Sequence, residues 1–399
     1  MRYSFADRVA EMEASDVKKM MEVIADPRII SLAAGSPAKS SFPIEELKTA
    51  SDAVYGDVSL EAFQYTNTEG FGPLREWISE RHNVTNQTHF QKNNVIITNG
   101  SQQGIDLIAK LFLNKGDIIL CERPTYASAL SAFRSYECQF LDVPLDSEGM
   151  LIENVENLIS KHNNIKLIYI VPTYQNPTGG TWSLERRKSI ATIAAKNGIV
   201  IVEDDPYKEL GFTDKPVPSI SKFDKQGNVI TLGSFSKTLC PGLRIGWVIA
   251  NEEIIEQLIY AKHATDVQTS SILQRQIYNY LKTGNFDAHL LTIRQKYKRR
   301  SKLAYDAIKK YFPVNIDFNE PEGGIFLWIT FPDYIDTGKL LFMALERGVA
   351  FVPGRLFYAD KSTHNNIRIN YSSVTVEDLI RGLEILGSLC KEVMLKEKE

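Results

Sequence analysis

The segment SFSKTLCPGLR, at residues 234–244, combines side chains suited to binding an anion and to reacting with a carbonyl group. Ser234 and Ser236 place two hydroxyls beside Lys237, and Arg244 follows seven residues later. A guanidinium binds oxyanions through two parallel hydrogen bonds, so Arg244 is suited to a phosphate. A lysine held away from water and near other positive charges has a lowered pKa, and its neutral amine can attack an aldehyde. Taken alone, a loop of this composition is also compatible with solvated surface.

Three further polar or glycine-rich segments each follow a short apolar run that is typical of a β-strand. NGSQQG follows NVIIT, and its glycines allow a turn into a helix whose first amides, at Ser101 and Gln102, can hold a phosphate. ERPTYAS follows DIILC and places Tyr126 where its ring can stack on a planar ligand. PTYQNPTGG follows KLIYIV and carries Asn176, whose carboxamide can donate to a ligand oxygen. An N-cap, a packed tyrosine and ordinary turn chemistry are the respective structural alternatives.

The segment EDDPYKEL follows the apolar run IVIVE and places Asp204 at a predicted strand end. A buried carboxylate is costly unless a partner compensates it, so Asp204 is expected to pair with a protonated ring nitrogen. Tyr207 offers a hydroxyl three residues later, and solvated acidic residues at a sheet rim are the alternative. Together the five segments describe a ligand with a phosphate, a flat ring, a phenolic oxygen, a ring nitrogen and an aldehyde. Pyridoxal 5'-phosphate has all of these groups.

The strand-like runs alternate with helix-like segments, which predicts an α/β fold with a largely parallel sheet and helices on both faces. Ligands bind such sheets at the carboxyl ends of the strands, where the five segments lie. IGWVIA follows VITLG closely and predicts an additional antiparallel strand. A charged helix and the strand-like pieces GGIFLWITF and NNIRINYS then predict a smaller α+β domain. The sequence predicts three parts. Residues 1–42 form an N-terminal segment that packs with the small domain, residues 43–275 form the large domain, and residues 276–399 form the small domain.

The composition excludes several other classes of protein. The 399 residues are 43% hydrophobic and 24% charged, which suffices for a large core, and 46 basic against 49 acidic residues give a net charge of -3. No global basic field is therefore expected to recruit nucleic acid or a membrane. The N-terminus lacks the apolar region of a signal peptide, and no apolar run approaches the roughly 20 residues that span a bilayer. The four cysteines are widely spaced and indicate neither a metal site nor a disulfide framework, which favours a cytoplasmic location. They are Cys121, Cys138, Cys240 and Cys390.

The chain resembles the fold type I aminotransferases of class I/II, which depend on pyridoxal 5'-phosphate. It is most similar to the subgroup that contains 2-aminoadipate and kynurenine aminotransferases, and it also resembles the aminotransferase-like domain of winged-helix regulators. The resemblance covers nearly the whole chain and rests on SFSKTLCPGLRIGW, EDDPYKEL and YQNPTGG. It implies a large, mainly parallel, seven-stranded sheet domain and a smaller α+β domain.

The resemblance also implies a role for each candidate residue. Lys237 would form the Schiff base with the cofactor, and Asp204 would pair with the pyridine nitrogen. Asn176 and Tyr207 would bind the ring hydroxyl, while Tyr126 would stack on the ring. The phosphate would be held by Ser101, Gln102, Ser234, Ser236 and Arg244.

Substrate binding and assembly follow from the same resemblance. Arg368 in NNIRINYS would bind the substrate carboxylate beside Asn176 and Gly35, with a structural salt bridge as the alternative. Tyr65 would reach the cofactor phosphate of a partner subunit, which implies a homodimer. Lys18 stands where aminoadipate-type relatives carry an arginine, and lysine is not an equivalent fork for a second carboxylate.

The expected activity is ping-pong transamination from an L-amino acid to a 2-oxo acid such as 2-oxoglutarate, with Lys237 as the proton shuttle and Asp204 and Tyr207 in support. Aromatic, branched-chain and 2-aminoadipate-like donors all remain open. A β-lyase is one alternative, because this fold hosts several reactions. A ligand-sensing module is another, although only about 40 residues precede the predicted fold and they hold no basic cluster.

Overall fold

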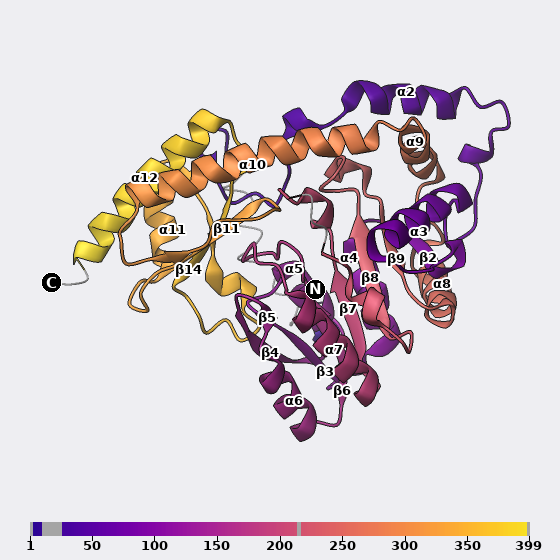
Figure 1. Cartoon of the computed structure of the whole chain (residues 1–399), viewed down its shortest axis with the longest axis horizontal. Helices are drawn as coiled ribbons and strands as arrows, with labels where there is room; N and C mark the ends of the chain where they lie inside the picture. Colours follow the sequence, from indigo (N-terminus) through magenta and orange to yellow (C-terminus); the bar gives the residue numbers. More distant parts are fainter. Residues whose placement is uncertain (1–2, 10–25, 214–216, 397–399) are drawn as a thin grey trace.

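The computed structural model describes residues 3–9, 26–213 and 217–396. The larger lobe of the chain contains an eight-stranded mixed sheet. Figure 1 shows this sheet with its helices. The strand order is β2-β9-β8-β7-β6-β3-β4-β5. The bounds are β2 (Val95–Thr98), β3 (Ile118–Arg123), β4 (Gln139–Asp146), β5 (Gly149–Met150), β6 (Ile165–Ile170), β7 (Val200–Asp204), β8 (Val229–Ser234) and β9 (Gly246–Ile249).

The five strands β4, β3, β6, β7 and β8 pair in parallel. Strand β9 is antiparallel to both β8 and β2, which confirms the prediction made from IGWVIA. The short strand β5 pairs with β4 and adds an eighth strand to the seven predicted. Central strands buried on both faces appear in sequence as continuous apolar runs, whereas β4 is largely half-exposed and its sequence QFLDVPLD gives a weaker signal.

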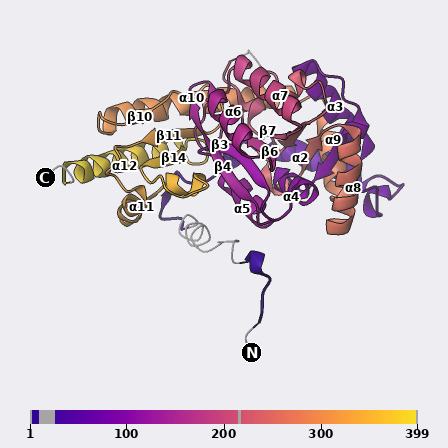
Figure 2. The same ribbon diagram turned by 90° about the horizontal axis from the view of Figure 1, so that it is seen from below.

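Helices cover both faces of this sheet, as predicted (Figure 2). One face packs against α4 (Ser101–Phe112), α5 (Ala127–Arg134) and α8 (Glu252–Asp266), and the other against α6 (Ile152–Lys161) and α7 (Leu184–Asn197). The side chain of Ser183 caps the start of α7 by accepting a hydrogen bond from the Arg186 amide. Gly198 ends α7 with a positive φ of 64°, a conformation that glycine adopts without strain.

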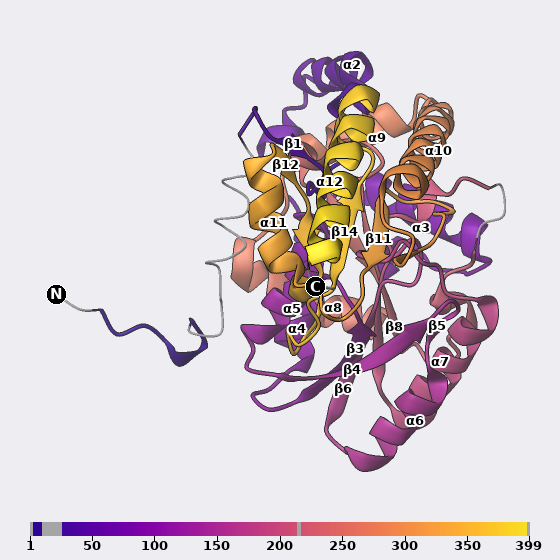
Figure 3. The same ribbon diagram turned by 90° about the vertical axis from the view of Figure 1, so that its left-hand side faces the viewer.

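The smaller lobe contains a four-stranded antiparallel sheet with the order β10-β11-β14-β13. Strands β11 and β14 lie at the predicted positions GGIFLWITF and NNIRINYS, and Figure 3 shows helices packed over the sheet. The longest helix, α10, extends from this lobe toward α9 and α2 at the far end of the molecule (Figure 1). The bounds are β10 (Asp317–Phe318), β11 (Phe326–Thr330), β13 (Val352–Pro353), β14 (Asn366–Asn370), α9 (Ser271–Leu281), α10 (Phe286–Tyr311), α11 (Thr337–Glu346) and α12 (Val376–Lys396).

The segment before the large sheet contacts both lobes. Strand β1 (Ile30–Ser31) pairs in parallel with β12 (Val349–Ala350), while α2 (Ile44–Tyr55) packs on α9. The domain boundaries at residues 42 and 275 stay a proposal. Within the described residues, no helix has the length and apolar character needed to cross a membrane. The remaining α-helix is α3 (Gly72–Asn86). Short 3-10 helices lie at Asp7–Val9, Lys39–Ser41, Glu61–Phe63, Lys92–Asn94, Lys208–Leu210, Ile220–Phe223, Pro241–Leu243 and Gly354–Phe357.

Candidate active site

One cavity is lined by every cofactor-binding residue predicted from the five strand-end segments. It lies at the carboxyl ends of β3, β6, β7 and β8 and at the start of α4, where ligands of open α/β sheets bind. The lining residues are Ser101, Gln102, Tyr126, Val171, Asn176, Asp204, Pro206, Tyr207, Ser234, Ser236, Lys237 and Arg244.

Lys237 follows β8, and its Nζ donates a hydrogen bond to the carbonyl oxygen of Gly35 at 2.7 Å. Burial lowers the pKa of Lys237 to about 8, the positive charges of Arg368 and Arg244 act in the same direction, and Asp204 opposes them. The neutral fraction of this amine near pH 8 is therefore much larger than that of a free lysine. The fold thus brings the candidate nucleophile and the predicted substrate-side glycine into direct contact.

Asp204, the last residue of β7, is only 2% exposed. Its Oδ2 accepts a hydrogen bond from the Tyr169 hydroxyl at 2.7 Å, whereas no donor among the described residues reaches its Oδ1. Burial raises the pKa of Asp204 to about 7, although the Tyr169 hydrogen bond acts against this. A buried carboxylate oxygen without a partner fits a protonated ring nitrogen, so the residues present fit the pyridine end of pyridoxal 5'-phosphate.

Tyr169 is a member of the site that the sequence analysis missed. It lies on β6, fully buried, and its ring packs edge-on against Phe133 at 5.4 Å between centroids. Its hydroxyl orients the Asp204 carboxylate from the neighbouring strand. A tyrosine within the otherwise aliphatic run LIYIV was the available signal, because a buried hydroxyl needs a partner.

The hydroxyls and the arginine expected to bind phosphate lie close together. The Oγ atoms of Ser234 and Ser236 are 3.0 Å apart, and Arg244 Nη1 lies 3.5 Å from Ser236 Oγ. Arg244 Nη2 also donates to the carbonyl oxygen of Asn99 at 3.2 Å. Gly100, with a φ of 74°, admits this guanidinium, because a Cβ there would lie 2.5 Å from Arg244 Nη2. Two hydroxyls, a guanidinium and the amides at the start of α4 form a set suited to a phosphate.

Arg368 reaches the site from β14 of the smaller lobe. It donates from Nη1 to Asn176 Oδ1 at 2.9 Å and from Nη2 to the carbonyl oxygen of Ala33 at 2.7 Å, while its buried Nε has no hydrogen-bond partner among the described residues. The guanidinium carbon lies 4.3 Å from the ring centroid of Phe326 and 5.1 Å from that of Phe357. Burial lowers the Arg368 pKa to about 10. The group remains a cation held by neutral partners, which suits it to an incoming carboxylate better than to a structural salt bridge.

Of the two predicted cavity tyrosines, Tyr207 is buried and Tyr126 is partly buried, and both remain protonated. Burial raises the pKa of Tyr126 and of Tyr207, so each hydroxyl is available as a donor. The Tyr207 ring also packs edge-on against Phe326 of the smaller lobe, at 5.6 Å between centroids. This contact joins the two lobes beside the cavity.

Four predicted site residues are not among those that line the cavity. Gly35 and Arg368 contact the lining residues Lys237 and Asn176, whereas Tyr65 and Lys18 are not placed there. Tyr65 is 81% exposed and does not line it, which is the position required of a residue that would reach a partner subunit. Lys18 lies outside the described residues. The prediction for Lys18 is therefore carried only by the sequence.

The raised pKa of Asp204 makes the stability of the cofactor-free protein depend on pH. The folded state binds the Asp204 proton more tightly than the unfolded state does, so this group destabilises the fold as pH rises from about 4 to about 7. Replacing Asp204 with asparagine is expected to raise the free energy of unfolding by on the order of 3 kcal/mol at pH 8, and by much less at pH 5. Urea denaturation of dialysed, cofactor-free protein measures this difference, and equal effects at both pH values would contradict it.

Comparison with known proteins places the chain in a family. It matches the model of aminotransferase class I and II over residues 27–386. The aromatic-amino-acid aminotransferase 1 of Thermococcus litoralis is 38% identical over 98% of this chain and 95% of its own length, and the 2-aminoadipate transaminase of Thermus thermophilus is 34% identical over 98% and 97%. The crystal structure of Pyrococcus horikoshii kynurenine aminotransferase in complex with PMP has a TM-score of 0.94 at 38% identity, covering 98% of this chain and 97% of its own. The chain therefore belongs to the class I and II aminotransferases, a family of pyridoxal 5'-phosphate-dependent enzymes.

Proposed function

We propose that the chain transfers the amino group of aromatic L-amino acids to a 2-oxo acid such as 2-oxoglutarate by ping-pong transamination. One observation carries this proposal. The Lys237 amine, the Asp204 oxygen that accepts no hydrogen bond from the described residues, and the Arg368 guanidinium meet at one site. Relatives named for aromatic amino acids and for kynurenine support an aromatic donor, as do the rings of Phe326 and Phe357 beside Arg368. Because one relative is named for 2-aminoadipate, that amino acid is included among the donors tested below.

In this proposal, different side chains of the cavity bind different parts of the cofactor. Asp204 would hold the ring nitrogen, Asn176 and Tyr207 the ring hydroxyl, and Tyr126 the ring face. The phosphate would lie against Ser101, Gln102, Ser234, Ser236 and Arg244. When bound, pyridoxal 5'-phosphate supplies a conjugated ring that withdraws electrons from the α-carbon of an amino acid.

The chain's own groups then bind the substrate and move its protons. Arg368 binds the α-carboxylate through its guanidinium and so fixes the α-carbon beside Lys237. Lys237 Nζ accepts the α-proton, which its lowered pKa permits near pH 8, and later returns a proton on the same side of the site. Asp204, held by Tyr169, keeps its charge directed at the ring nitrogen.

The proposal is tested by incubating the purified holoenzyme with 2-oxoglutarate and a panel of amino donors. The panel contains phenylalanine, tyrosine, tryptophan, kynurenine, leucine and 2-aminoadipate, and the products are identified by mass spectrometry. We expect glutamate and the matching 2-oxo acid, with the highest kcat/KM for the aromatic donors. Higher kcat/KM for leucine or 2-aminoadipate would overturn the donor assignment. Release of ammonia without glutamate would overturn transamination in favour of a lyase.

Replacing Arg368 with lysine is expected to lower kcat/KM for the amino donor roughly 10²-fold, because a lysine cannot reproduce a bidentate contact with a carboxylate. The loss should appear mainly in KM, while the visible absorbance of the bound cofactor is retained. Steady-state kinetics with phenylalanine measures it. Arg381→Lys, an exposed arginine of α12, is the control and should behave as wild type. An unchanged KM in Arg368→Lys would remove Arg368 from substrate binding.

A homodimer in which Tyr65 contacts the partner's cofactor phosphate is also part of the proposal. Tyr65 is exposed within a segment that exposes other apolar side chains, among them Val58 at 95% and Leu60 at 61%. Exposed apolar clusters of this kind are typical of interaction surfaces. Tyr65→Phe is expected to weaken pyridoxal 5'-phosphate binding about tenfold by removing one hydrogen bond to a charged group. Equilibrium dialysis measures this, with Tyr55→Phe as the control, and a monomer in analytical ultracentrifugation would contradict the arrangement.

A cytoplasmic location belongs to the same proposal. All four cysteines are free thiols, and Cys121 and Cys390 are buried. Free thiols of this kind are typical of proteins from a reducing compartment.

A further inference from the structure

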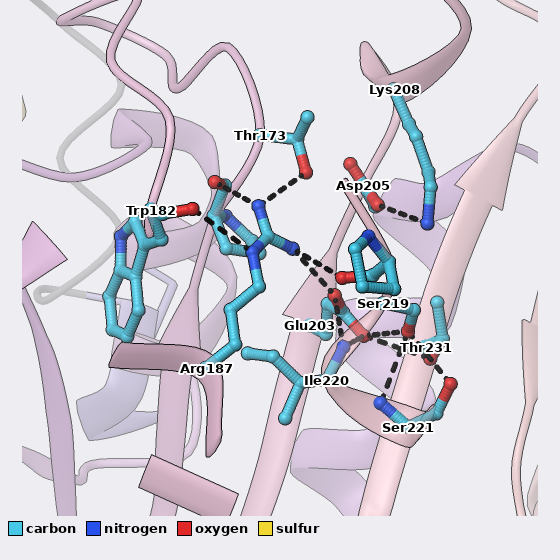
Figure 4. Close-up of polar contacts among 12 residues, drawn as sticks. Thr173, Trp182, Arg187, Glu203, Asp205, Lys208, Ser219, Ile220, Ser221 and Thr231 are labelled. Carbon is cyan, nitrogen blue, oxygen red and sulfur yellow. Dashed lines mark hydrogen bonds and ion pairs between the residues drawn. The ribbon is translucent and has the colours of Figure 1, made fainter. Parts of the chain in front are cut away.

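Arg187 and Glu203 form a buried ion pair, and Figure 4 shows the polar contacts around it. Both side chains have no exposed surface, and Arg187 Nη1 lies 3.6 Å from Glu203 Oε1. Successive side chains of a strand point to opposite faces of the sheet, so Glu203 faces α7 while its neighbour Asp204 faces the cavity. The cavity lining described above contains neither member of the pair.

Arg187 donates hydrogen bonds to both ends of the segment that carries Asn176, residues 172–182. From helix α7, its Nη2 donates to the carbonyl oxygen of Pro172 at 2.6 Å, and its Nε donates to that of Trp182 at 3.2 Å. The Trp182 amide also donates to the Pro172 carbonyl oxygen at 2.8 Å, so the two ends of residues 172–182 meet at the guanidinium. The Thr173 hydroxyl accepts a further hydrogen bond at 3.1 Å. This side chain of α7 therefore helps to fix the position of the segment.

Glu203 fixes the strand end that carries Asp204. Its carboxylate accepts hydrogen bonds from the Ile220 amide at 3.0 Å, from the Thr231 hydroxyl at 3.3 Å and from the Ser219 hydroxyl. These contacts join β7 to β8 and to the turn before it, as Figure 4 shows. Arg187 donates to the same turn, at the carbonyl oxygen of Pro218, at 3.2 Å.

A fully buried arginine must direct every donor to an acceptor, because an unpaired buried charge is strongly destabilising. Arg187 meets this requirement with acceptors on the segment of residues 172–182, on the turn at Pro218 and on Glu203. The planar guanidinium of Arg187 fixes the directions of these hydrogen bonds, and a lysine ammonium cannot reproduce them. The segment and the strand end are consequently held in one relative position.

We propose that the Arg187–Glu203 pair is a positioning device that sets Asn176 relative to Asp204, and through Asn176 sets Arg368. The inference rests on the proposed function, in which Asn176 and Asp204 bind two parts of one cofactor ring. Asn176 Oδ1 accepts a hydrogen bond from Arg368 Nη1 at 2.9 Å, so a shift of its segment also displaces the carboxylate-binding guanidinium. Glu122 anchors the same segment from β3 through the Val171 amide and the Trp182 indole, so loss of the Arg187 fork shifts the segment rather than releasing it.

The test compares Arg187→Lys with Arg186→Lys. Arg186 is the adjacent arginine of α7, but its guanidinium bonds Asp146 at 2.7 Å and the Met150 carbonyl oxygen, neither of which belongs to residues 172–182. For each holoenzyme the dissociation constant of 3-phenylpropionate, an unreactive carboxylate, is measured by titrating the cofactor absorbance. We expect about tenfold weaker binding in Arg187→Lys, because small misplacements of binding groups have large effects, and no change in Arg186→Lys.

Combining each change with Asn176→Ala separates positioning from general damage. If Arg187 acts through Asn176, Arg187→Lys adds almost nothing to the loss already caused by Asn176→Ala. An equal tenfold loss in both backgrounds, or unchanged binding in Arg187→Lys with only a lower melting temperature, would overturn the inference. Should Arg187→Lys fail to fold, Glu203→Gln is measured in the same two backgrounds, and the same results would support or overturn the inference. Wild-type protein that binds no pyridoxal 5'-phosphate would instead refute the proposed function.

Discussion

Replacing Lys237 with alanine is expected to lower kcat by at least about 10⁴-fold, because one amine serves both as covalent attachment point and as proton carrier. Lys237 lines the cavity, its Nζ contacts the Gly35 carbonyl oxygen, and burial lowers its pKa to about 8. Single-turnover experiments, in which the variant loaded with cofactor is mixed with phenylalanine, measure the loss directly. The visible absorbance that the wild type shows with cofactor should also be displaced in the variant.

Two controls identify what the Lys237 side chain contributes. Lys237→Arg keeps a positive charge but cannot lose its proton near neutral pH, so it should be as inactive as the alanine variant. Lys222→Ala removes a lysine that bonds Gln87 at 2.7 Å, outside the cavity, and should retain wild-type turnover. Wild-type turnover in Lys237→Arg would show that only a charge is needed, and would remove Lys237 from its assigned role.

The strand ends of this fold were predictable because their local signals and their positions in space coincide. Buried parallel strands appear as apolar runs, and each polar residue that ends such a run must lie at one edge of the sheet. The predictions for Asp204, Asn176 and Lys237 needed only this rule, and these residues do line one cavity. The same rule missed β4, whose half-exposed residues do not form an apolar run.

Contacts between distant segments were not predictable in the same way. Tyr169 acquires its role only because β6 lies beside β7, and Gly35 contacts Lys237 across 202 positions of sequence. Arg187 gives no signal at all, because ERRK is typical of a charged helix face while the fold buries that side chain completely. Periodicity places a residue on a face of an element, but only the packing of elements decides which oxygen atoms it meets.

Asp204→Asn is the second change for which we expect a large effect. The Asp204 carboxylate is buried, one of its oxygens is held by Tyr169, and the other is available to a protonated ring nitrogen. An asparagine has nearly the same volume and can still contact Tyr169, but it carries no charge to favour the protonated ring. Breaking a buried charge pair costs about 3–5 kcal/mol, which corresponds to a loss of roughly 10² to 5 × 10³-fold in kcat.

Stability and turnover should respond to Asp204→Asn in opposite directions, and this separates a functional charge from a structural one. The substitution removes the cost of burying the carboxylate and stabilises the cofactor-free protein at pH 8, yet it slows the holoenzyme. Steady-state kinetics with phenylalanine and urea denaturation are measured on the same preparations. Asp106→Asn is the matched control, because the Asp106 carboxylate also accepts a hydrogen bond from a tyrosine hydroxyl, that of Tyr136 at 3.0 Å, but does not line the cavity, so turnover should change little. An Asp204→Asn variant that is both less stable and equally active would assign Asp204 to the fold rather than to the reaction.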